Sequence, residues 1–119
     1  NDYSSGRVFD DALCYSFYPI DLHTKDGVVP KHLKRGVVPT IPRGALIPKG
    51  STNLMVAGRC LSSDRLANSA ARVQASCMGM GQAAACTAVL AAKSSITPKE
   101  VPLGEIHSLL REHGAIVPA

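Results

Sequence analysis

The sequence has 119 residues, with 13 Lys and Arg against 9 Asp and Glu, so its formal net charge is +4. Hydrophobic residues make up 45% and charged residues 18%, which is typical of one small folded domain and excludes a disordered chain. The composition also excludes a collagen, a disulfide-dense mini-protein and a heptad-rich coiled coil. Aromatic residues make up only 4%, so the chain lacks the stacking surfaces that nucleic-acid bases prefer.

The first 42 residues predict short strands joined by loops. Residues 10–18 favour a strand or a short helix, and residues 18–23 are extended because Pro19 disfavours helix at the residue before it. Asp21 and His23 then lie on one face of that strand. Residues 25–42 form a basic, solvated loop and edge. A nucleic-acid patch is the alternative there, and the few aromatics and missing recognition helix argue against it.

The middle of the chain predicts two strands and a long helix. The strands are residues 43–47 and 53–57, joined by a turn at 48–51, and the second is apolar enough to be buried on both faces. A polar segment follows, and then a helix over about 74–93. Small residues repeat along this helix, which predicts close packing over most of its surface: Gly81, Ala84, Ala85 and Ala88.

The C-terminal part predicts a helix with clear boundaries. Thr97 and Glu100 form a capping-box sequence, with Pro98 at the first helical position. A helix follows over about 103–113, ended by Gly114, with a buried side made of Ile106, Leu109 and Leu110. His107 and His113 lie near its end, and we expect both on the surface, not as ligands.

The cysteines predict reduced structural thiols in a cytoplasmic compartment. Cys14, Cys60, Cys77 and Cys86 form no C-x-x-C pair and match no common zinc spacing, so no metal site is expected. The chain opens at Asn1 without Met or a signal segment, which we expect of an internal piece of a longer protein.

Two patterns in the long helix are misleading. Residues 73–92 carry no charge and could span a bilayer by length, yet they are rich in Ala and contain Gln, Ser and Thr, so we expect a buried helix and no membrane partner. Residues 79–84 match G-x-G-x-x-A, the dinucleotide fingerprint. No strand precedes this match, so we interpret its glycines as helix-packing positions.

One corner of the sequence favours an anion. Gly58 ends a predicted strand and allows a ligand to approach the backbone, while Arg59 beside it supplies a cationic fork. The N–H groups near Ala75, Ser76 and Cys77 lie at the start of the long helix, where backbone donors and the helix dipole attract negative charge. These residues indicate an anion-binding corner without specifying its ligand.

The residues around this corner resemble the C-terminal part of a family of FAD-dependent oxidoreductases. The resemblance is carried by RGALIPKGSTNLMVAGRC at 43–60, ARV at 71–73 and CMGMGQAA at 77–84, and extends to GRVFDDAL, YPIDLH and the tail. It implies an α+β fragment of an α/β FAD-binding fold. Residues 1–42 would be substrate-domain-like, residues 43–93 would complete a Rossmann-type FAD domain, and residues 94–119 would be a helical tail.

The resemblance also implies a cofactor site. Gly58 and Arg59 stand where the family passes the ribityl and pyrophosphate part of FAD, and Gly81 where it has a packing glycine. The helix start faces the flavin ring with Val73, Ala75, Ser76, Cys77 and Met78, and Arg72 is a candidate catalytic residue toward flavin or substrate. The chain departs from the family pattern in three places: residues 66–69 lack a frequent His, Ala75 replaces a frequent Pro, and Ala85 replaces a frequent Gly.

Two functions follow as hypotheses. The first is a flavin-dependent oxidoreductase whose parent protein transfers a hydride between an organic substrate and flavin; this chain supplies one wall of the site and binds FAD weakly or not at all by itself. The second is a self-standing interaction module without catalysis, which predicts a homo-oligomer through exposed strand edges.

Overall fold

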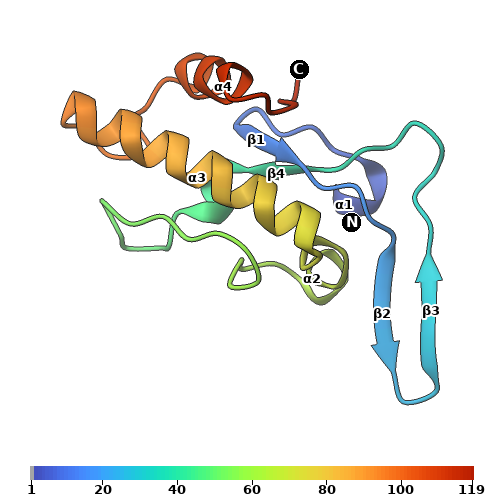
Figure 1. The fold of residues 1–119 in the computed structure, drawn as a ribbon. Helices are drawn as coiled ribbons and strands as arrows, with labels where there is room; N and C mark the ends of the chain where they lie inside the picture. Colours follow the sequence, from blue (N-terminus) through green and yellow to red (C-terminus); the bar gives the residue numbers. More distant parts are fainter. Residues whose placement is uncertain (1) are drawn as a thin grey trace.

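One long helix and two pairs of short antiparallel strands make up an α+β fold, as expected (Figure 1). The computed structural model describes residues 2–119. Its elements in chain order are α1 (Asp2–Ser5), β1 (Ala12–Tyr15), β2 (Ile20–Thr24), β3 (Gly27–Lys31), β4 (Thr40–Pro42), the 3-10 helix η1 (Arg43–Leu46), α2 (Arg65–Ala71), α3 (Gln74–Ser94) and α4 (Leu103–Glu112).

The two strand pairs have different roles. β1 pairs with β4 against α3, and Leu13 of β1 is fully buried there. β2 and β3 form a hairpin with a two-residue loop, in which Thr24 pairs with Gly27. Figure 1 shows this hairpin extending away from the body of the molecule, with α2 beside the start of β2. Polar side chains line the space between the hairpin and α2.

The helix predicted over 74–93 is confirmed as α3, but its packing differs from the prediction. Its buried residues form one stripe, which includes Met80, Ala83 and Thr87 and lies against β1 and α4. Ala85 and Ala88 are exposed, and a Cβ at Gly81 would meet no atom within 4 Å. Three of the four small residues therefore pack closely on no neighbour among residues 2–119, and the expectation of close packing over most of the helix is wrong.

The two strands predicted at 43–47 and 53–57 are wrong. Residues 43–46 form η1, because Asp11 accepts from the backbone N–H groups of Arg43 through its carbonyl (2.8 Å) and Gly44 through Oδ2 (2.8 Å) and folds the chain over. Residues 53–57 are irregular and only half-buried, with Leu54 52% exposed. Their one tie to the preceding segment is Val56 N–H to the Leu46 carbonyl at 2.8 Å, and no neighbouring strand pairs with them among the described residues. The turn at 48–51 is confirmed by the bond from Ser51 N–H to the Pro48 carbonyl.

The other predictions for the first 71 residues were partly right. Residues 10–18 contain β1, and residues 18–23 lead into β2, where Asp21 and His23 lie on one face as predicted. The loop and edge predicted at 25–42 contain two strands, β3, whose residues are all exposed, and β4. The polar segment after Leu61 was not predicted to be helical, yet it forms α2 because the Asp64 side chain caps the N–H groups of Leu66 and Ala67.

The C-terminal prediction is confirmed. Glu100 accepts from the Thr97 N–H (2.8 Å) and hydroxyl (2.7 Å), which forms a single turn before α4. Ile106 and Leu110 are buried, and Gly114 ends the helix with φ +78°, a conformation that favours glycine. His113 is exposed, but His107 is half-buried and its Nε2 lies 2.8 Å from the Ala12 carbonyl, so the prediction of a surface role is wrong for His107.

By length and composition alone, α3 is one helix that could cross a membrane. About 39% of its apolar window is buried inside the molecule.

Candidate functional site

The corner predicted from sequence forms where two short segments meet. Gly58 opens a tight turn with φ +87°, closed by Leu61 N–H to the Gly58 carbonyl at 3.1 Å. α2 ends at Ala71 with Arg72 as its C-cap, and Val73 is extended (φ −71°, ψ 154°), so α3 starts in a new direction at Gln74. A Cβ on Gly58 would lie 3.9 Å from Cys77, which places the turn beside the first turn of α3.

The backbone carbonyl of Arg72 joins these two segments. It accepts from Arg59 Nε at 3.2 Å and from Cys77 Sγ at 3.5 Å. Arg59 is thereby fixed beside the helix start, and its two terminal guanidinium nitrogens have no acceptor among residues 2–119. A guanidinium held this way presents two charged donors to a ligand.

An open hollow of about 620 Å³ lies at this corner. It is lined by Arg59, Gln74, Cys77 and Met78. Val73, the N-cap of α3, supplies no side-chain cap, so the N–H groups of Gln74, Ala75 and Ser76 have no partner in the described part of the chain. The Cys77 N–H donates to the Val73 carbonyl at 3.0 Å, so this amide, expected to be open, is already used. Open donors and the helix dipole make the hollow electropositive.

The side chain of Ser76 points away from the hollow. Its hydroxyl bonds the Ser16 hydroxyl at 2.8 Å, and Tyr3 Oη donates to the Ser16 carbonyl at 2.9 Å. Desolvation by burial raises the pKa of Tyr3, against the lowering effect of its bonds to the Ser16 hydroxyl and the Tyr18 carbonyl. This buried network anchors the start of α3 to β1, so only the backbone of Ser76 can meet a ligand.

The structure therefore brings most of the proposed cofactor residues together. Gly58, Arg59, Cys77 and Met78 meet at or beside the hollow, with Met78 75% exposed. Val73 is half-buried at the cap, and Ala75 is exposed on the first turn of α3. The Arg72 carbonyl faces this corner, but its side chain lines a different hollow.

This second hollow lies between β2 and α2 and measures about 470 Å³. It is polar, and four ionisable residues of β2, α2 and the α2 C-cap line it: Asp21, His23, Arg65 and Arg72. Asp21 Oδ2 lies 3.6 Å from His23 Nε2. Arg72 Nε donates to the Ser69 carbonyl at 3.3 Å, which holds the guanidinium along α2.

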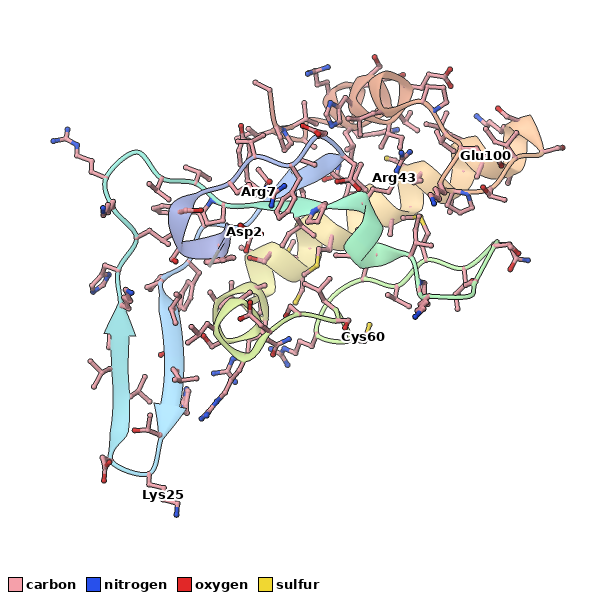
Figure 2. The ribbon with its side chains drawn as sticks, turned by 180° about the vertical axis from the view of Figure 1, so that it is seen from behind. Asp2, Arg7, Lys25, Arg43, Cys60 and Glu100 are labelled. Carbon is pink, nitrogen blue, oxygen red and sulfur yellow. The ribbon has the colours of Figure 1, made fainter. Side chains whose placement is uncertain are left out.

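The cysteines are all free, in agreement with reduced thiols. Burial raises the pKa of Cys14 to about 12 and also raises the pKa of Cys86. Cys60 is exposed at the outer edge of the loop before α2 (Figure 2). Among residues 2–119, no group of three metal-binding side chains gathers.

Comparison with protein families gives a match over most of the chain. A family model described as FAD dependent oxidoreductase matches residues 1–110, which is nearly the whole chain. The chain belongs to the FAD dependent oxidoreductase family. Neither the curated proteins nor the solved structures gave a match. Family membership makes FAD the cofactor to consider for the Arg59 hollow.

Sequence reasoning missed Gln74 and the polar hollow. Gln74 carries the first open amide of α3, and its position directly after the cap could have been read from the helix boundary. Arg65, Asn68 and Arg72 are spaced i, i+3 and i+7, which places them on one helix face. The N-capping Asp64 was the signal for this helix.

Proposed function

We propose that this chain supplies one wall of the FAD site in a flavin-dependent oxidoreductase, which transfers a hydride between an organic substrate and flavin. The observation that carries the proposal is the Arg59 hollow, where the Arg59 guanidinium is held beside the start of α3 and Gln74 lines the same space with the first open N–H of that helix. Family membership supports the choice of cofactor.

The donor set fits the flavin part of FAD. The flavin ring carries carbonyl oxygens and gains negative charge on reduction. Arg59 would bind an anionic or carbonyl oxygen, and the N–H groups of Gln74, Ala75 and Ser76 would donate to a second one. When bound, the flavin supplies the hydride chemistry. The chain's own residues position the ring and favour its negative charge, because the N-terminus of α3 stabilises anions. Met78 would cover part of the ring from solvent.

We further propose that these residues are the C-terminal part of a longer, cytoplasmic flavoprotein whose Rossmann-type FAD domain lies in another segment. Both sheets within residues 2–119 are two-stranded and antiparallel, so the βαβ unit for the pyrophosphate and adenosine must come from elsewhere. We also propose that α3 packs within that protein and does not cross a membrane, because residues 73–92 are rich in Ala and contain Gln, Ser and Thr.

The proposal is tested in the full flavoprotein by replacing Arg59. Arg59→Gln removes a charged hydrogen-bond donor, so we expect FAD affinity to fall at least tenfold, since such bonds contribute about 1.5–3 kcal/mol. Flavin absorbance per protein after dialysis measures this. Arg35→Gln, an exposed arginine in the loop between β3 and β4, is the charge-matched control. Equal FAD retention by both variants would refute the assignment.

A further inference from the structure

The polar hollow between β2 and α2 has the chemistry of a ligand site. Arg65, Asn68 and Arg72 project from one face of α2 toward β2, and Leu22 lies among them as an apolar wall. Arg65 Nη2 makes one long contact, 3.5 Å to the His23 carbonyl. The terminal nitrogens of Arg72 and the Asn68 amide have no partner among residues 2–119. Several donors therefore converge on one space without being used inside the protein.

The charges of the hollow select the ligand. Arg65 and Arg72 contribute two positive charges and Asp21 one negative charge, so the lining carries a formal +1 with His23 neutral. A single carboxylate matches this charge, and a guanidinium binds it through two parallel bonds. Asp21 and His23 can accept hydrogen bonds from hydroxyl groups, whereas the Asp21 carboxylate repels a multiply charged phosphate.

The position of Arg72 links this hollow to the Arg59 hollow. Its carbonyl is bonded to Arg59 and Cys77 on one side, and its side chain lines the polar hollow on the other. A ligand held by the Arg72 guanidinium thus lies next to the corner assigned to flavin.

We propose that the polar hollow binds a hydroxylated organic acid, with its carboxylate on Arg65 and Arg72 and a hydroxyl on Asp21 or His23. The identification of this acid as the substrate rests on the proposed function. The binding of the acid in the polar hollow does not depend on that function. It names a substrate class for the oxidoreductase and gives Asp21, Arg65 and Arg72 the role of selecting it.

The test is a titration of the ¹⁵N-labelled chain with gluconate, which carries one carboxylate and several hydroxyls, followed by NMR without flavin. We expect shifts at residues 21–23 and 63–72. Sorbitol, which has hydroxyls but no carboxylate, should bind at least tenfold more weakly, and so should inorganic phosphate. Hexanoate, which has a carboxylate but no hydroxyls, should bind more weakly than gluconate.

Variants separate the two halves of the proposal. Arg72→Gln should weaken gluconate binding at least tenfold, Arg72→Lys less than that, and Arg35→Gln should leave binding unchanged. Asp21→Asn should weaken gluconate relative to hexanoate, because the neutral amide oxygen is a weaker acceptor for a hydroxyl and no longer repels the carboxylate. A dispersed spectrum in each variant shows that it is folded.

The proposal is overturned if sorbitol or phosphate binds as well as gluconate, or if Arg72→Gln leaves gluconate affinity unchanged. Because no flavin is present, this outcome is distinct from failure of the flavin assignment. If the chain bound gluconate but FAD did not bind at the Arg59 hollow, this proposal would stand and the flavin assignment would be refuted.

Discussion

Burial changes the chemistry of individual side chains, as two of the cysteines show. Cys14 is buried against Gly79 of α3, and its pKa rises to about 12, while Cys60 is exposed and bonded only to the Ala57 carbonyl at 3.2 Å. The thiolate is the reactive form of cysteine, so Cys14 and Cys60 differ in reactivity although they are the same type of residue.

We predict that a thiol reagent at pH 8 modifies Cys60 first and Cys14 only after unfolding. Against the ordinary value of 9.0, a pKa of about 12 lowers the thiolate fraction of Cys14 about a thousandfold. The raised pKa also means that its contribution to stability is complete below pH 9 and is lost as pH rises toward 12. Mass spectrometry of peptides after timed labelling gives the order. Early labelling of Cys14 in the folded protein would contradict the packing of β1 on α3.

A second prediction concerns Tyr3, whose hydroxyl contacts the Ser16 carbonyl, the Ser16 hydroxyl and the Tyr18 carbonyl. Tyr3→Phe should lower the free energy of unfolding by about 1–3 kcal/mol, because buried acceptors lose their donor. Tyr15→Phe is the control, since the Tyr15 hydroxyl has no protein partner in the described chain. Urea unfolding measures both. Equal losses in the two variants would show that the Tyr3 network does not anchor α3.

Among the elements, boundaries made by local chemistry could be predicted, and those made by distant partners could not. The Thr97–Glu100 turn, α4 and its end at Gly114 depend on neighbouring residues, and all three were predicted. η1 depends on Asp11, more than thirty positions away, and its residues were predicted as a strand. The polar hollow needs β2 beside α2, which no local pattern indicates.

Two glycines give opposite predictions for the same substitution. Gly81→Ala should stabilise the chain by about 1 kcal/mol, because the position is helical with open space around it and Ala is the better helix former. Gly114→Ala should destabilise it by about 1 kcal/mol, because φ is +78°. Thermal unfolding of both variants measures the signs. A destabilised Gly81→Ala chain would mean that another surface packs on that face of α3.

The whole molecule is elongated, and a hairpin projects from its body. The radius of gyration is 14.6 Å and the extents are 50 × 30 × 21 Å, against about 13–14 Å for a compact chain of this length. Figure 2 shows Lys25 at the tip of the hairpin, far from Arg43 and Glu100. Val29 in the hairpin and Met78 and Val89 on α3 are exposed apolar residues. If the chain were instead a self-associating module, these surfaces would be its contacts, and sedimentation at high concentration would then show a dimer, whereas a monomer would count against that function.

The family could be recognised from sequence because its motifs are contiguous, at residues 43–60 and 71–84. The corner itself depends on how Gly58 and Arg59 come to lie beside the start of α3. The sequence-based prediction relied on a strand at residues 53–57, and these residues form no strand. In the structure, the bond from Arg59 to the Arg72 carbonyl, and not strand pairing, holds Arg59 at the start of α3. The cofactor role of these residues stays a prediction.

The most direct test of the flavin assignment is an NMR titration of the ¹⁵N-labelled chain with FAD. We predict weak binding, in the millimolar range or above, because one wall lacks the pyrophosphate and adenosine contacts. The shifts should concentrate on the amides of residues 74–78 and on the Arg59 guanidinium, and they should be lost in Arg59→Gln. Shifts confined to other surfaces, or a submillimolar dissociation constant that Arg59→Gln leaves unchanged, would contradict the account.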